Sequence, residues 1–400
     1  MSLDLFLAED HQARNVWAFV ERQDLSALHE GIRAVEGHAG RPAIDPRILL
    51  ALWLQATLDG IGSARRLARL CNESLPYMWI CGDVSVNYHT LSDFRRNTEL
   101  LDDLLTRTVA ALMEGGLAEM QQVAQDGTRI KASANPKSFR RRPTLREHAK
   151  AAHDQVERLK QELETDPSAG SKRERAARQR AAKERVEGIE RAIEAANEIS
   201  KKRATNKSKR AARGSETDPD ARVMKFAETG FKPGYNCQFA VDTRDQIIVG
   251  AAVTNVGSDK GELEPMLEQL EERYDRRPTQ VLVDGGYTSN DDVVSATQSG
   301  VEVIMPPRHP ANPSRGRYEP VHRDPPEVAE WRRRMGTTIA QEAYRRRAPT
   351  VECVNAITKN RGMGTLLVRG LEKVRAVVLL HAIAHNLGRA MKLGSAIVAT

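Results

Sequence analysis

Two short apolar segments of the chain each end on an aspartate that is followed by glycine. They are 123–127 and 281–285, and the aspartates are Asp126 and Asp284. Apolar runs of this length are typical of buried strands, and a strand end presents a side chain from a rigid position. The glycine leaves room for a ligand to come close. If the two strands are neighbours in one sheet, the two carboxylates converge.

Two facing carboxylates repel each other, and a divalent cation relieves that repulsion. Oxygen ligands favour Mg²⁺ or Mn²⁺ over zinc. The pattern alone leaves an alternative open, because either aspartate can simply cap a turn. Asp242, Asp259 and Asp292 stand in comparable surroundings. The pair therefore indicates a metal-dependent site only when other features point the same way.

Strand-like and helix-like segments alternate from residue 116 onward. The segments 235–241 and 246–254, joined by a polar turn, predict a β-hairpin. Helices are expected at 261–274, 290–299, 351–359 and 371–391, a strand at 301–305, and an irregular Pro- and Arg-rich stretch at 306–335. This order predicts an α/β fold with a mixed sheet and flanking helices.

Residues 1–115 are expected to be helical throughout. Asp45 followed by proline, Ser63 and Asn87 are N-cap residues that each open a short helix. Short helices with tight turns resemble a helix-turn-helix arrangement, which would bind DNA through arginines. An ordinary helical bundle with a solvated basic face is the alternative. The arginines on these helices are Arg65, Arg66, Arg95 and Arg96.

The positive charge of the chain is concentrated in one segment. Residues 137–213 hold 23 Lys and Arg against 12 Asp and Glu, a local net charge of +11, whereas the whole chain carries +7. Apolar residues at helical spacing on both sides of a break at 166–170 predict a basic helical pair inserted at 140–213. Contact with DNA is expected, with a self-paired solvated helix pair as the alternative.

Composition excludes several classes of protein. Aromatic residues make up only 4%, which argues against a single-strand binder built on base stacking. The four cysteines lack C-x-x-C spacing, so neither a zinc site nor a disulfide framework is indicated. No signal peptide or bilayer-spanning stretch is recognised. We therefore expect a cytoplasmic, nucleoid-associated protein with reduced thiols and no membrane partner.

A third acidic residue stands near the C-terminus. Pro349 and Thr350 predict a helix start, which would place Glu352 in the first turn. Lys359, seven residues later, would lie on the same face. Such a face would combine a metal-ligating carboxylate with a phosphate-binding ammonium group. The alternative is a surface helix with its acid early and its base late, as the helix dipole favours.

Together these segments resemble bacterial insertion-sequence transposases of the DDE class. Residues 125–132 are similar to the first acidic motif of that family, and 283–287 to the second. Residues 344–359 resemble the Y-x2-R-x3-E-x6-K motif. Residues 40–46 with the helices up to Arg96, and the closing 369–375 with 385–387, are similar to the family's N-terminal and C-terminal segments. The resemblance covers most of the chain outside the basic insertion.

The third motif departs from the family pattern by one residue. Four residues rather than three separate Arg347 from Glu352, although Tyr344-x2-Arg347 and Glu352-x6-Lys359 both hold. The sequence therefore leaves open whether Arg346 or Arg347 is the functional arginine.

The resemblance implies an RNase H-like fold and a catalytic triad. Asp126 would lie on the first strand, Asp284 on the fourth and Glu352 on a late helix, and the three would bind two Mg²⁺ (or Mn²⁺) ions. One ion would activate a water or a DNA 3′-OH and the other would stabilise the leaving oxygen. Lys359 and the arginines beside Tyr344 would hold DNA phosphates.

The function that follows is metal-dependent strand cleavage at insertion-sequence ends and strand transfer to target DNA. The partners would be double-stranded DNA, as terminal repeats and target, and a second copy of the chain on that DNA. A catalytically silent DNA-binding protein and a general RNase H-like nuclease are the alternatives. The expected domains are a DNA-binding 1–115, a catalytic domain formed by 116–139 and 214–400, and the insertion 140–213.

Overall fold

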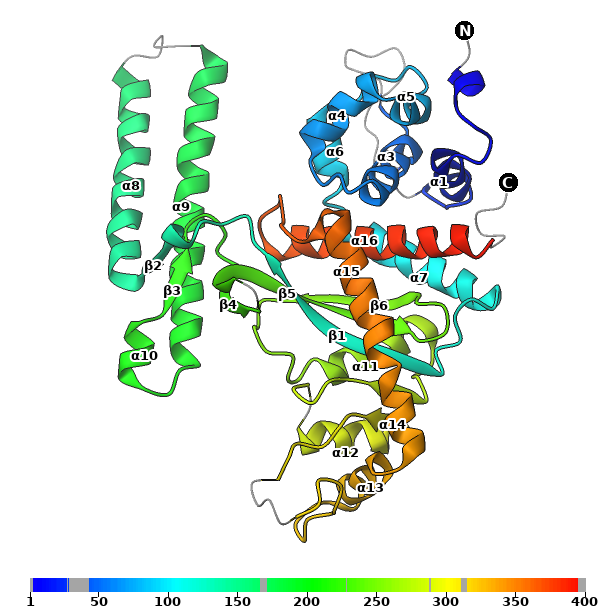
Figure 1. The fold of residues 1–400 in the computed structure, drawn as a ribbon. Helices are drawn as coiled ribbons and strands as arrows, with labels where there is room; N and C mark the ends of the chain where they lie inside the picture. Colours follow the sequence, from blue (N-terminus) through cyan, green and yellow to red (C-terminus); the bar gives the residue numbers. More distant parts are fainter. Residues whose placement is uncertain are drawn as a thin grey trace.

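The computed structural model describes residues 3–26, 28, 43–165, 171–227, 229–287, 289–310 and 315–394. A mixed sheet with flanking helices follows a region of short helices (Figure 1). The mixed α/β class expected from the sequence is thereby confirmed. Residues 40–42 of the N-terminal motif and the expected break at 166–170 lie outside the described residues.

The N-terminal helices begin where the sequence predicts. The side chains of Asp45, Ser63 and Asn87 each accept a backbone N–H at the start of a helix, which satisfies donors that have no partner within the helix. The helices are η1 (Leu3–Phe6), α1 (Gln12–Glu21), α3 (Pro46–Leu58), α4 (Ala64–Glu73), α5 (Leu75–Cys81), α6 (Tyr88–Phe94) and α7 (Thr98–Glu114). The last of them, α7, packs against α16 (Leu371–Lys392) at the other end of the chain.

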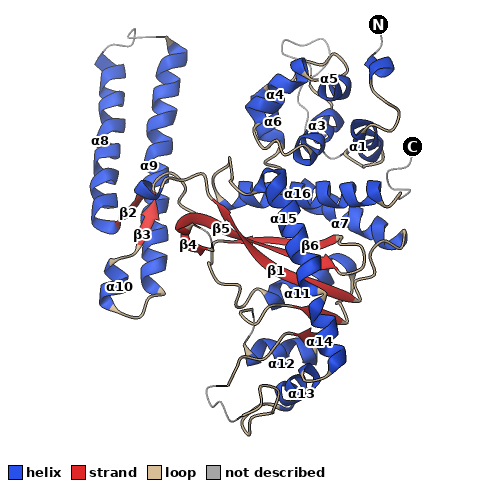
Figure 2. Cartoon of the chain, in the orientation of Figure 1, coloured by secondary structure: helices blue, strands red, loops and turns tan. Residues whose placement is uncertain are grey.

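The central sheet has strand order β4-β5-β1-β7-β8. The sixth strand, β6, lies off this path and also pairs with β5. β1 runs antiparallel to β5 and parallel to β7, and β7 runs parallel to β8. Figure 2 shows these strands crossing the middle of the molecule. Their bounds are β1 Gln122–Lys131, β4 Arg222–Phe226, β5 Gly230–Asp242, β6 Ile248–Thr254, β7 Gln280–Leu282 and β8 Glu302–Ile304.

Different helices cover the two faces of the sheet. On one face, α11 (Leu263–Tyr274) packs so closely on β6 that a Cβ added to Gly250 would meet the Met266 sulfur. On the other face, a late helical segment that includes α15 (Cys353–Thr358) lies across β1 and β5 (Figure 1). Side chains alternate between the faces along a strand, so Gln125 and Asp126 point to opposite sides.

The stretch 306–335 is not irregular throughout, contrary to the sequence expectation. Its second part forms α13 (Pro326–Met335), which buries Val328, Trp331 and Met335. These apolar residues recur at helical spacing, and proline at the first helical position is compatible with a helix start. The remaining helices of this region are α12 (Asn290–Gln298) and α14 (Thr338–Arg345).

The basic insertion is a helical pair, as expected. α8 (Arg142–Thr165) and α9 (Lys172–Lys201) share a small core of their own, which includes Val186 and Ile189. A short ribbon of β2 (Phe139–Arg141) and β3 (Arg213–Ser215) connects the pair to the rest of the chain, with η2 (Pro136–Ser138) before it and α10 (Asn206–Arg210) after α9.

A buried carboxylate fastens the exit of the insertion to the body. Asp218, which is fully buried, accepts hydrogen bonds from the Tyr235 hydroxyl (2.7 Å) and from the backbone N–H of Gly370 (3.1 Å). Asp220 accepts from the N–H of Leu371 (2.9 Å). The two carboxylates therefore cap α16, whose first N–H groups have no partner within the helix.

Candidate active site

The sequence predicted that Asp126 ends its strand, but this prediction is wrong. Asp126 lies in the middle of β1. The reason is that pairing with β5 continues from Val123 to Lys131, whereas parallel pairing with β7 stops at Ala124. The partner of Ala124 on β7 is Leu282. Two residues further along are Asp126 and Asp284, but Asp284 lies beyond the end of β7, where its carboxylate accepts the backbone N–H of Gly286 (2.8 Å). Its charge raises the pKa of Asp126, so the two carboxylates lie near each other.

Glu352 is linked to Asp126 through one arginine. The guanidinium of Arg347 lies 2.9 Å from the Glu352 carboxylate and 3.6 Å from the Asp126 carboxylate. Asn355, one turn after Glu352, donates a hydrogen bond of 3.2 Å to Asp126. The late helical segment therefore brings an acidic, a basic and an amide side chain onto the face of β1 that carries Asp126.

A π-helical turn explains the extra residue in the third motif. Residues Ala348–Glu352 (η3) form a π turn between α14 and α15. A π turn takes up one residue more than an α turn, so side chains five apart share a face as side chains four apart do in an α-helix. Arg347 and Glu352 are five apart and in contact. Glu352 therefore lies within a continuing helix, and Thr350 is not an N-cap, since its hydroxyl donates to the carbonyl of Arg346 (2.7 Å).

Burial makes Asp126 a weak acid for an aspartate. Loss of solvation raises its pKa to about 6, Arg347 opposes that rise, and the charges of Asp284, Asp259 and Glu352 add to it. Burial of Arg347 disfavours its charge, but Asp126, Tyr344 and Glu352 raise its pKa above the usual value. The cation is therefore held charged between carboxylates that would otherwise repel one another.

The donor set of this site fits a hard divalent cation. It offers carboxylate oxygens, and the buried Oδ1 of Asn355 has no hydrogen-bond partner among the described residues. Within those residues, no three His, Cys, Asp or Glu side chains stand close enough together to hold a metal ion. The guanidinium of Arg347 supplies the positive charge between Asp126 and Glu352 instead.

The carboxylate of Asp259 lies on the opposite face of β1, which α11 covers. Asp259 packs so tightly on Gly127 that a Cβ there would overlap its carboxylate. It accepts hydrogen bonds from Asn236 (2.6 Å) and Gln238 (2.8 Å), and Arg129 lies 3.5 Å away. In the sequence Asp259 appears only as a competitor for the triad. Its relation to Gly127 depends on a contact between distant segments.

Two family models match this chain. The Transposase domain (DUF772) matches residues 1–97, and the Transposase DDE domain matches residues 211–387, which includes Asp284 and Glu352. The chain belongs to the insertion-sequence transposases. No curated protein and no solved structure matched it.

Membership of this family makes the chain a phosphoryl-transfer enzyme of DNA transposition, with DNA as its partner. DDE transposases typically use a divalent metal ion. Within the described residues, the transposase has no helix that is long and apolar enough to cross a bilayer.

The remaining C-terminal residues of the transposase take different places around Asp126. Tyr344 lies beside Arg347, whose guanidinium is 5.9 Å from the centre of its ring. Arg346 is exposed at the end of α14, so of the two arginines only Arg347 reaches the carboxylates. Lys359 is exposed, and its charge opposes the burial that raises the pKa of Cys237, a residue of β5. Lys359 thus stands over the same face of the sheet.

The four N-terminal arginines divide into an exposed group and a buried one. Arg65, Arg66 and Arg96 are exposed; Arg65 stacks on Tyr88 at 5.1 Å, and Arg96 pairs with a neighbouring aspartate. Arg95 is buried. Its guanidinium donates to the carbonyl of Gly62 (2.6 Å) and lies 4.2 Å from the centre of the Trp53 ring. The expectation that Arg95 contacts DNA is therefore wrong for this arrangement, because its donors and its flat face are used inside the helical region.

Gly127→Ala tests the close approach of Asp259 to β1. The added methyl group would force Asp259 and Gln238 aside, and overpacking of this kind costs about 1–3 kcal/mol of unfolding free energy. Urea unfolding measures the loss. Gly285→Ala is the matched control, since a Cβ there meets only the carbonyl of Pro306 at 3.5 Å, an ordinary contact. Equal stability of the two variants would contradict the tight packing.

Proposed function

We propose that this transposase is an RNase H-like enzyme whose catalytic triad is Asp126, Asp284 and Glu352. The observation that supports it most is the contact of Arg347 with both Asp126 and Glu352, beside the charge of Asp284, which raises the pKa of Asp126. Asp126 lies on β1, the first strand of the sheet, and Asp284 follows β7, the fifth strand of that sheet in chain order after β1, β4, β5 and β6. The family resemblance implies a place on the fourth strand, and the short edge strand β4 accounts for the difference in the count.

The triad carboxylates would hold two Mg²⁺ or Mn²⁺ ions. Bound ions of this kind lower the pKa of a nucleophilic water or 3′-OH and stabilise the charge on the leaving oxygen. The chain needs no nucleophile of its own. Asn355 orients the Asp126 carboxylate through its hydrogen bond.

Basic residues around the triad would bind the DNA backbone. Arg347 is held charged by its acidic neighbours, and cations bound to those carboxylates would leave its guanidinium available for a phosphate. Lys359, Arg346 and the ring hydroxyl of Tyr344 lie on the same late segment. The products are strands cut at the element ends and joined to target DNA, formed by a homodimer that holds two ends.

The proposed division of the chain keeps the boundaries expected from the sequence. Residues 1–115 bind the element ends through the exposed Arg65, Arg66 and Arg96. Residues 116–139 with 214–400 are catalytic, and 140–213 form a basic arm on the DNA. Helix α7 belongs to the first segment in sequence but packs on α16, and thereby connects end recognition to the catalytic part.

Strand cleavage of a duplex carrying the parent element's ends tests this function. The reaction is run with Mg²⁺, with EDTA, and with Asp284→Asn. We expect cutting at the element end that requires both the metal and Asp284. Tight binding without cutting under any metal would contradict the proposal and favour a catalytically silent DNA-binding protein. Metal-dependent cutting that ignores the end sequence would favour a general nuclease instead.

A further inference from the structure

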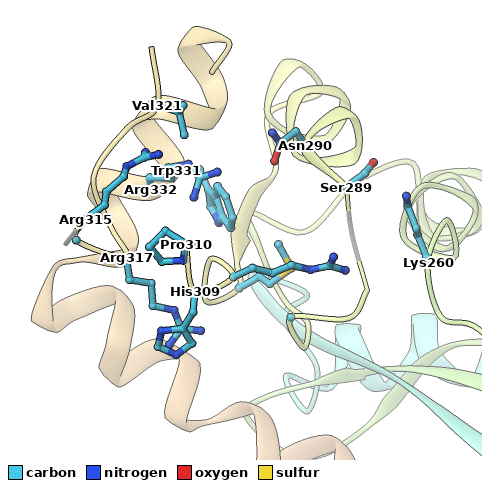
Figure 3. A pocket seen from close by; sticks show the side chains of 14 residues that line it. Lys260, Ser289, Asn290, His309, Pro310, Arg315, Arg317, Val321, Trp331 and Arg332 are labelled. Carbon is cyan, nitrogen blue, oxygen red and sulfur yellow. The ribbon is translucent and has the colours of Figure 1, made fainter. Parts of the chain in front are cut away.

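A basic hollow of about 540 Å³ opens next to Asp284 (Figure 3). Gly285 forms part of its wall, so the hollow begins one residue after the proposed catalytic carboxylate. Among the described residues that line it, none is acidic. Five are permanently cationic: Lys260, Arg308, Arg315, Arg317 and Arg332.

The cations come from separate elements and surround the space. Figure 3 shows Lys260 on one side, Arg315 and Arg317 on the opposite side, and Trp331 of α13 between them. Ser289 and Asn290, at the start of α12, complete the wall. That helix start is already capped by Asp292, so the side chains rather than the helix end supply the positive potential.

Two of the five cations are held in place by carbonyl oxygens rather than by carboxylates. Arg317 donates through Nε to the carbonyl of Pro307, and Arg315 donates to the carbonyl of Glu319. Carbonyl acceptors fix a guanidinium but leave its charge and its other N–H groups available. Arg332 is the exception, because it pairs with the buried Asp324 at 2.7 Å.

Trp331 of α13 also lines the hollow. Its Nε1–H is buried and has no hydrogen-bond partner among the described residues, so it presents no donor at the surface of the hollow. The cations that line the space therefore decide the ligand, and they fit one that is rich in anionic oxygen.

We propose that this hollow is an anion subsite that takes backbone phosphates of the DNA strand adjoining the bond cut at Asp284. The inference rests on the proposed function for the identity of the anion. The volume lies within the range of about 300–1,000 Å³ that is typical of small-ligand sites, so it admits a nucleotide unit of one strand but not a duplex. A guanidinium can donate two parallel hydrogen bonds to the oxygens of one phosphate, so arginines fix the position of the DNA strand as well as attract it.

The test measures binding of the element-end duplex by the full chain in EDTA, as a function of salt. The double variant Arg308→Gln/Arg317→Gln is compared with Arg276→Gln/Arg333→Gln, a matched pair of exposed arginines that do not line the hollow. Each phosphate contact contributes about 0.7–0.9 to the slope of log affinity against log salt. We expect the slope to fall by about 1.4–1.8 in the hollow variant, which loses two such contacts, and to stay unchanged in the control. Arg308→Lys/Arg317→Lys should restore it if the protein folds and the charge is what counts.

Duplexes with one phosphate at a time replaced by neutral methylphosphonate locate the contact. In the parent protein, replacements next to the cut should weaken binding, and in the hollow variant the same replacements should have no further effect. An unchanged salt slope, or methylphosphonate effects that persist in the variant, would overturn the proposal. The proposal would also be overturned if pyrophosphate stabilised the parent protein against heat while the salt slope of DNA binding stayed unchanged in the hollow variant. The hollow would then bind a free anion rather than DNA. Failure of the proposed function appears separately, as absence of metal-dependent cutting by the parent protein.

Discussion

Asp126→Asn is expected to abolish strand cleavage while making the metal-free protein more stable at pH 8. The loss of cleavage follows from the loss of a metal ligand. A catalytic metal contributes several kcal/mol to transition-state stabilisation, and each 1.36 kcal/mol is a factor of ten in rate, so we expect a decrease of about a thousandfold or more. Cleavage of the element-end duplex under single-turnover conditions measures it.

The gain in stability follows from the raised pKa of Asp126. The folded-state pKa is about 6, against the ordinary value of 3.8, so between these pH values the folded state retains a proton that the unfolded state has released. The free energy of unfolding therefore falls as the pH rises from about 4 to 6 and stays low above 6. Asparagine carries no charge to desolvate, and it should recover about 3 kcal/mol at pH 8 and little at pH 4.

Asp154→Asn, on the exposed surface of α8, is the control for Asp126→Asn. It should change neither the rate of strand cleavage nor the free energy of unfolding. Denaturant unfolding at pH 4, 6 and 8 in EDTA separates the two variants. If Asp126→Asn loses stability at pH 8, the carboxylate stabilises the fold through Arg347 and Asn355 by more than its burial costs. If it cuts DNA normally, Asp126 is not a metal ligand.

The parts of the fold that depend on neighbouring residues could be predicted from the sequence. Asp45, Ser63 and Asn87 act on N–H groups within three residues, so each helix start can be recognised locally. The hairpin of β5 and β6 is likewise local, because a short polar turn joins two apolar runs. The helix α13 carries buried residues at helical spacing, but the surrounding prolines and arginines obscured it.

The features that depend on distant contacts could not be predicted. Asp126 stands in mid-strand because β5, more than a hundred residues later, continues to pair with β1 beyond it. Arg95 is buried because its guanidinium donates to the Gly62 carbonyl and stacks on the Trp53 ring, whereas its neighbour Arg96 remains exposed. Nothing in the local sequence distinguishes these two arginines.

The candidate site was predicted in its residue types but not in its geometry. Asp126, Asp284 and Glu352 were identified by motif, and one extra residue before Glu352 left the functional arginine open. The π turn brings Arg347 and not Arg346 onto the carboxylates, which favours Arg347 as the functional arginine. A π turn adds one residue to a helix and leaves no reliable mark in the sequence.

The affinity for metal is expected to fall about tenfold for each pH unit below about 6 and to level off above it. Asp126 must lose its proton before it can bind a cation, and its pKa of about 6 sets the midpoint. Calorimetric titration of the full chain with Mn²⁺ between pH 5 and 8 measures the affinity. A midpoint near 3.8, the ordinary pKa of an aspartate, would show that burial does not raise the pKa of Asp126.

Two variants should move that midpoint in opposite directions. Asp259→Asn removes a negative charge that raises the pKa of Asp126, so the midpoint should move to lower pH. Arg347→Gln removes the positive charge that lowers it, so the midpoint should move to higher pH. Above the midpoint the Arg347 variant should bind Mn²⁺ more tightly than the parent, because the cation no longer competes with a guanidinium between Asp126 and Glu352. Weaker binding at pH 8 would mean instead that Arg347 arranges the carboxylates for the metal, and the arginine would then be a positioning residue rather than a stand-in for the ion.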